Sequence, residues 1–124
     1  MPSSEQRLAL TVIHASFLAG ILIFFGVTLY LAPDPTPTSA LWRWAWLIVT
    51  AGAVFGSGFV RGRLPRNAAP ERVQTTGIVI WALAEGSAMF GLVSMWVTGA
   101  LAPALGATLV AVFLFILHRP ATLW

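Results

Sequence analysis

Glu85 is the residue with the clearest capacity for chemistry, because it is the single charged side chain between Val73 and Thr98. It lies twelve positions after Val73, about 18 Å along a helix axis, which is near the middle of a bilayer core roughly 30 Å thick. A carboxylate at that depth costs on the order of 2.5 to 3.5 kcal/mol unless it is protonated or partnered. Three roles are open: a reversible proton or cation site, a buried carboxyl that hydrogen-bonds a neighbouring helix, and a contact to a partner subunit. Ser87 is the nearest hydroxyl in sequence and a second candidate for this polar site, although it lies about 200° around a helix from Glu85.

His14 is the other polar group of interest, six residues inside an apolar run that begins at Leu8. A neutral histidine can be an axial ligand of haem iron or chlorophyll magnesium, and the small Ala15 beside it would leave room for a macrocycle. A lone histidine is more often a hydrogen-bonded packing residue. We therefore expect no obligatory cofactor, and keep haem or (bacterio)chlorophyll at His14 as the alternative.

Other catalytic chemistry has little to build on. The chain has no cysteine, which excludes disulfides, thiolate metal sites and cysteine nucleophiles. It also lacks a glycine-rich phosphate loop, a Ser–His–Asp arrangement and a cluster of metal ligands. The sequence predicts a protein that is not an enzyme and has no metal site.

Composition determines which elements must position these residues. Of 124 residues, 58 % are hydrophobic and 9 % are charged, whereas a soluble domain carries roughly 25 % charged residues. Apolar runs of about 20 residues are long enough to cross a bilayer as helices, and backbone groups in lipid must bond within their own helix. We predict an all-α bundle in a single transmembrane domain over 1–124. Its spans are 8–31, 41–60, 73–98 and 101–117, and residues 32–40 form a proline-rich loop. In a three-span alternative, the short last segment lies in the interface.

Arginine distribution predicts the orientation. With four spans, Arg7, Arg119 and the arginines of the middle loop share one side, and Arg43 alone lies opposite. The positive-inside rule places both termini and that loop in the cytoplasm, as in a multi-pass protein of a bacterial inner membrane. This orientation explains the basic charge without a nucleic-acid partner.

Eight residues are expected at the membrane edges, where they would contact lipid headgroups or a partner. They are Arg61, Arg63, Arg66 and Arg72 in the loop, and Trp42, Arg43, Trp44 and Trp46 at the start of the second span. Bound lipid is therefore expected.

Small residues four positions apart indicate where helices approach closely in lipid. Three such pairs occur in the apolar runs: Gly52 and Gly56, Ser87 and Gly91, and Ala102 and Gly106. We predict that these pairs lie at helix contacts.

Residues 66–93, RNAAPERVQTTGIVIWALAEGSAMFGLV, resemble the polar loop and carboxylate helix of the c, or proteolipid, subunits of rotary ATP synthases. Arg66, Asn67, Pro70 and Glu71 match the loop, and Glu85 matches the carboxylate that binds a proton or sodium ion in that family. The resemblance covers under a quarter of the chain and implies an ion-binding role for Glu85. The preceding span lacks the family's dense run of glycines, so the resemblance does not extend to a rotor ring.

From these observations we expect a non-catalytic small subunit, or an assembly or stabilising factor, of a larger energy-transducing membrane complex of photosynthetic, respiratory or ATP-synthase type. Its partners would be other transmembrane subunits and membrane lipids. One alternative is a proton or cation carrier that uses Glu85 in the manner of a c subunit. Another is a haem- or chlorophyll-binding membrane anchor that uses His14.

Overall fold

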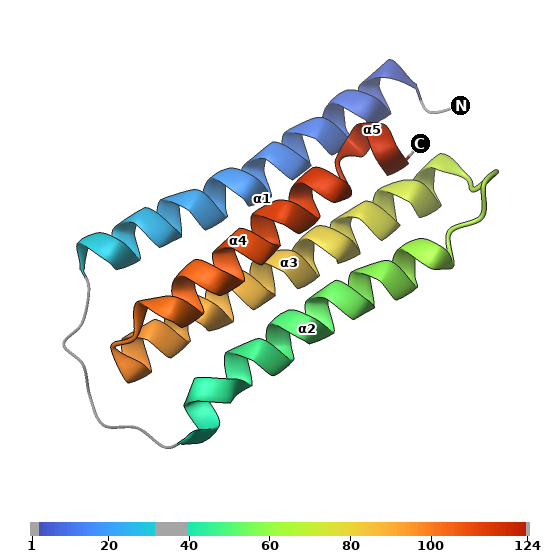
Figure 1. Cartoon of the computed structure of the whole chain (residues 1–124). Coiled ribbons are helices and arrows are strands. Elements are labelled where there is room, and N and C mark those ends of the chain that lie inside the picture. Colours follow the sequence, from blue (N-terminus) through green and yellow to red (C-terminus); the bar gives the residue numbers. More distant parts are fainter. Residues whose placement is uncertain (1–2, 32–39, 124) are drawn as a thin grey trace.

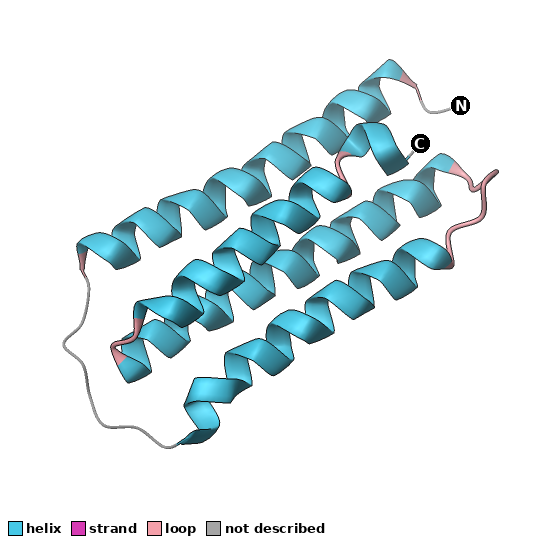
Figure 2. Ribbon diagram, in the orientation of Figure 1, coloured by secondary structure: helices cyan, strands magenta, loops and turns pink. Residues whose placement is uncertain are grey.

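The computed structural model describes residues 3–31 and 40–123, which form an all-helical bundle (Figures 1 and 2). Throughout these residues no strand occurs. The prediction of an all-α protein is therefore confirmed. The predicted loop at 32–40 lies outside the described residues, except for Ala40, where the second helix begins. The helices are α1 (Ser4–Tyr30), α2 (Ala40–Gly62), α3 (Pro70–Thr98), α4 (Leu101–Leu117) and the short α5 (Pro120–Leu123).

Helices α1 and α3 begin before the predicted apolar runs because local capping, and not hydropathy, sets these two ends. Ser3 caps α1 in a capping box: its hydroxyl accepts from the Gln6 backbone N–H at 3.2 Å, and its own N–H donates to the Gln6 side chain at 2.9 Å. Helix α3 begins three residues before the predicted span, at Pro70, whose fixed φ suits the first turn. The four long helices match the four predicted spans apart from their limits, and the short α5 (Pro120–Leu123) was not predicted.

Helices α3 and α4 form the centre of the bundle, and α1 and α2 flank this pair on opposite sides (Figure 1). Both described ends of the chain and the loop between α2 and α3 lie at the same end of the bundle. Helices α1, α2 and α3 are long and apolar enough to cross a membrane. Helix α4 has 17 residues and is shorter, but it lies lengthwise against α3. This arrangement is consistent with a multi-pass membrane protein.

A tight turn joins α3 to α4 and brings the two helices into close contact. Gly99 adopts a left-handed backbone (φ 70°), and its N–H donates to the Met95 carbonyl at 2.7 Å. Two turns earlier, Gly91 faces α4 so closely that a Cβ there would lie 2.4 Å from the Ala107 Cβ and 2.6 Å from the Pro103 carbonyl oxygen. Only a glycine lets the two backbones approach this far.

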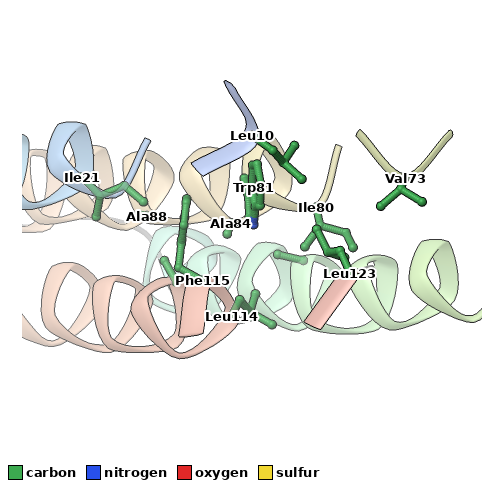
Figure 3. Close-up of a cluster of buried hydrophobic side chains, with 12 residues drawn as sticks. Leu10, Ile21, Val73, Ile80, Trp81, Ala84, Ala88, Leu114, Phe115 and Leu123 are labelled. Carbon is green, nitrogen blue, oxygen red and sulfur yellow. The ribbon is translucent and has the colours of Figure 1, made fainter. Parts of the chain in front are cut away.

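The buried core runs along α3 and is completed by the other helices (Figure 3). Its largest member is Trp81, which is fully buried, as is Phe115 of α4. The cluster consists of Leu10, Ile21, Ala53, Val73, Ile80, Trp81, Ala84, Ala88, Ala111, Leu114, Phe115 and Leu123. Every long helix contributes, but α3 supplies the most residues, so it is the element around which the bundle is organised.

The other predicted small-residue pairs are only partly at contacts. Gly52 is exposed, and no heavy atom of another described element lies within 4 Å of where its Cβ would be, so its expected helix contact is wrong. Gly56 makes an ordinary contact with Leu83 of α3, at 3.4 Å from its Cβ position. Ala102 is exposed, whereas Gly106 lies against the Trp46 ring of α2. Spacing alone cannot tell which face of an apolar helix meets its neighbour, because lipid accepts small residues equally well.

Candidate functional site

Glu85 lies at the middle of α3, as the 16th of its 29 residues, on the side that faces α1. Its side chain is half-buried, and Oε1 lies 3.7 Å from where a Cβ would be on Gly20 of α1. This is an ordinary van der Waals distance, so α1 lies directly against the carboxylate at this point. Among residues 3–31 and 40–123, no hydrogen bond or ion pair to the Glu85 carboxylate is formed. The site is therefore an unpaired carboxylate in the seam between α1 and α3.

Ser87 does not join Glu85. Its hydroxyl is buried and donates to the Thr50 hydroxyl of α2 at 3.2 Å. Ser87 therefore faces α2 while Glu85 faces α1, as the rotation of about 200° between the two positions requires. Ser87 therefore makes its own buried polar link between α2 and α3, separate from Glu85.

His14 is part of a network that fixes the end of α4. Its Nε2 lies 2.9 Å from the Phe115 carbonyl oxygen, and because a carbonyl only accepts, Nε2 carries the proton. The imidazole packs edge-on against the Trp81 ring at 4.8 Å, and Trp81 Nε1 donates to the His118 carbonyl at 2.9 Å. The last carbonyls of a helix have no partner within it, so His14 and Trp81 cap α4 from two other helices.

This position of His14 bears directly on cofactor ligation. A metal bound at Nε2 would have to displace the Phe115 carbonyl, and a macrocycle would have to displace the packed Trp81 ring. The part of the chain that the structure describes also contains no group of three or more His, Cys, Asp or Glu side chains placed to hold a metal ion. Ligation of haem or chlorophyll by His14 stays a prediction that requires this network to open.

Arginines gather at the end of the bundle that carries both described chain ends. Arg61, in the last turn of α2, donates through Nη2 to the Thr122 carbonyl, and its Nη1 is buried with no partner within residues 3–31 and 40–123. Burial lowers the pKa of His118, at the end of α4, below its ordinary value, and the positive charge of Arg61 lowers it further. The Arg63 guanidinium lies over the Phe59 ring, 4.3 Å from its centroid. The guanidinium groups of Arg61 and Arg63 are therefore held by neighbouring residues and are not fully solvated.

Three shallow pockets at this end are each lined by arginine. The first, of about 210 Å³, is formed by Phe59, Val60, Arg63, Leu64, Pro65, Arg72 and Thr76. A second of about 210 Å³ is formed by Arg61, Leu64, Pro65, Arg66 and Leu123. The third, of about 200 Å³, is formed by Arg7, Thr11, Pro120 and Ala121. The four loop arginines predicted to contact lipid or a partner thus divide between two adjacent pockets that share Leu64 and Pro65.

The opposite end of the bundle holds the tryptophans expected at a membrane edge. Trp42 stacks on Phe90 of α3 with 6.1 Å between ring centroids, and Trp46 covers Gly106 of α4. These two rings therefore pack against neighbouring helices, and their role is not confined to contact with headgroups. Trp44 is exposed, as is Arg43. The pocket of about 330 Å³ at this end is lined by Arg43, Trp44, Trp46, Leu47, Thr98, Ala100, Ala102 and Pro103.

Several residues of these sites did not stand out in the sequence. Gly20 lies against the Glu85 carboxylate, and Thr50 accepts the hydrogen bond of Ser87. In the sequence, the only signal for these positions was a small or polar residue within an apolar run. Thr108 is buried on α4, and its hydroxyl has no partner within the described residues. No periodicity in the sequence marked it.

Compared with protein-family models, with curated proteins and with solved structures, the chain matches none. The resemblance of residues 66–93 to rotary c subunits therefore stays a prediction.

Proposed function

We propose that this chain is a non-catalytic subunit, or a stabilising factor, that docks in the membrane against other transmembrane chains through the seam between α1 and α3. The observation that supports the proposal is the half-buried Glu85 carboxylate at the middle of α3, which lies beside Gly20 and is unpaired within the described chain. An unpaired carboxylate at that depth is costly in lipid. A partner helix with a cationic or hydrogen-bond-donating side chain at the same depth would remove that cost.

The surface around Glu85 suits such a partner. Helix α1 exposes large apolar side chains along most of its length, among them Leu22, Ile23 and Phe24. Dispersion contacts and polar contacts drive helix association in lipid, where the hydrophobic effect between helices is lost. An apolar face with one half-buried acid at its edge combines an extensive contact surface with one specific polar position.

The distribution of charge supports an orientation in the membrane, and the resemblance to c subunits supports a class of partner. Six of the seven arginines lie in or beside the end with both described chain ends, and we propose that this end is cytoplasmic in a bacterial inner membrane. The similarity of residues 66–93 to c subunits supports an energy-transducing complex as the partner. Other transmembrane subunits and lipids, and no nucleic acid, are the proposed contacts.

A proton or cation carrier is the competing function, because the same carboxylate could alternate between its protonated and charged forms. The geometry gives this function less support. His14, on the neighbouring helix α1, is a candidate for a relay toward the arginine end, and its Nε2 is already bound to the Phe115 carbonyl. The pockets described above are lined by residues near the helix ends.

The experiment compares Glu85→Gln with Glu71→Gln, an exposed acid at the start of α3. A photo-crosslinking amino acid at Phe24, exposed on α1 one turn from Gly20, should give one discrete adduct with a transmembrane protein in native membranes. Glu85→Gln should abolish that adduct and the comigration of the chain with a larger complex on native gels, whereas Glu71→Gln should preserve both.

Proton or sodium flux in proteoliposomes separates the two functions. Docking predicts that the purified wild-type chain gives no more flux than empty vesicles. Flux that Glu85→Gln abolishes would establish the carrier instead. A wild-type chain that runs alone on native gels and forms no adduct would refute docking.

A further inference from the structure

The pocket formed by Arg61, Leu64, Pro65, Arg66 and Leu123, here called the Arg61 pocket, lies where three parts of the chain meet. Arg61 belongs to the last turn of α2, Arg66 to the loop before α3, and Leu123 to α5. We infer that the Arg61 pocket binds the phosphate group of an anionic phospholipid, and that Arg61 and Arg66 are its ligands.

The state of the Arg61 guanidinium is the observation that carries this inference. Nη2 donates to the Thr122 carbonyl, which fixes the direction of the planar group, while Nη1 is buried and has no partner among the described residues. A buried charged donor without an acceptor is unfavourable. A phosphate oxygen is an acceptor that guanidinium binds well, often through two parallel hydrogen bonds.

The charge around the pocket favours an anion. Its lining holds two arginines and no acid. Glu71, the nearest acid in sequence to the loop, is exposed and forms no ion pair within the described chain. His118 does not offset this preference, because burial and Arg61 lower its pKa and keep it neutral near pH 7. The positive charge of Arg61 and Arg66 is therefore available to a ligand.

Two features favour a lipid over free phosphate. Leu64, Pro65 and Leu123 supply apolar wall, which a lipid's glycerol and upper acyl chain would cover. The pocket also lies at the end of helices long enough to cross a membrane, where basic pockets meet anionic headgroups. The adjacent pocket shares Leu64 and Pro65 and adds Arg63 and Arg72, so a second phosphate position borders the first.

The test measures lipid binding by native mass spectrometry of the purified chain in mild detergent, titrated with phosphatidylglycerol. Loss of one charge-assisted hydrogen-bonding partner should weaken binding about tenfold in both Arg61→Gln and Arg66→Gln. Arg119→Gln is the matched control, because Arg119 is exposed at the same end, carries the same charge and does not line the pocket. Because this charge is exposed and screened by salt, its effect should stay within about twofold.

Arg61→Gln also removes the bond to Thr122, which can destabilise the fold. If that variant does not fold, Arg66→Gln, in the exposed loop, tests the inference by itself. Equal binding by Arg66→Gln and Arg119→Gln would overturn the inference. So would binding of zwitterionic phosphatidylcholine as tight as that of phosphatidylglycerol. Inorganic phosphate at millimolar concentration distinguishes the sources: failure to displace the lipid assigns the site to a lipid, and displacement assigns it to soluble phosphate.

Discussion

Gly91 provides the sharpest test of how α3 and α4 pack. A Cβ at this position would lie 2.4 Å from the Ala107 Cβ and 2.6 Å from the Pro103 carbonyl oxygen, whereas carbon atoms in contact prefer about 3.5 to 4.0 Å. Gly91→Ala therefore forces the helices apart by roughly 1 Å, because the obstructing atoms are a Cβ and a backbone oxygen that cannot rotate away. Overpacking of this kind costs about 1 to 3 kcal/mol, which exceeds the gain of roughly 0.5 to 1 kcal/mol that alanine brings to a helix.

Gly52→Ala is the matched control, because the position on α2 is exposed and open. It should be neutral or stabilising by up to about 1 kcal/mol. The assay is equilibrium unfolding in mixed micelles, titrated with a denaturing detergent and followed by fluorescence of the six tryptophans. Gly91→Ala should unfold at clearly lower denaturant than wild type, and Gly52→Ala should not.

A double variant tests whether the named contacts are responsible. Adding Ala107→Gly to Gly91→Ala removes the contact at 2.4 Å and leaves the one at 2.6 Å to Pro103. The pair should therefore be less destabilised than the sum of the two single variants, with a coupling energy of about 0.5 to 3 kcal/mol. The packing would be refuted if Gly91→Ala were as stable as Gly52→Ala, or if the double variant were simply additive.

Two further predictions concern the end of α4. His14→Ala removes the bond to the Phe115 carbonyl and the contact with Trp81, so the free energy of unfolding should fall by about 2 to 4 kcal/mol; in the same assay, no change would remove His14 from the network. For His118, whose folded pKa lies below its ordinary value of 6.5, the unfolded chain binds the proton more readily. Stability is then full above pH 6.5 and declines as pH falls through the lowered pKa. His118→Gln should flatten the change in unfolding midpoint between about pH 7.5 and about pH 5.5, and a slope equal to that of wild type would contradict this assignment.

The sequence identified the helices because apolar runs and their breaks are local signals. The close approach of α3 and α4 at Gly91 followed from the spacing of small residues, which is also local. The partners across helices did not. His14 and Phe115 are 101 positions apart, and nothing local to either residue indicates the other. The depth of Glu85 along its helix could likewise be predicted, but not that its carboxylate lies beside Gly20.

The physical reason is that lipid makes apolar residues acceptable on every side of a helix. In a soluble bundle, the buried face of a helix is marked by apolar residues at a period of 3.6, with polar residues opposite. Helix α1 carries exposed apolar residues around much of its circumference, including Leu8, Val12, Leu22 and Phe24. Hydropathy therefore could not show which face of α1 meets α3, and the same uncertainty produced the error at Gly52.

The same property indicates how α1 is held. It buries Leu10, Ile21 and Thr28, whereas α3 buries eleven residues, so α1 is attached to the bundle over a small area. Partly buried apolar side chains such as Phe17 and Leu18 add to this attachment, and one specific polar contact joins it, the bond between His14 and the Phe115 carbonyl. Without a hydrophobic drive between helices, such sparse contacts leave most of α1 free for another chain. A partner that pairs with Glu85 would then contact α1 and α3 together. Its binding would stabilise the limited contact between α1 and the rest of the bundle.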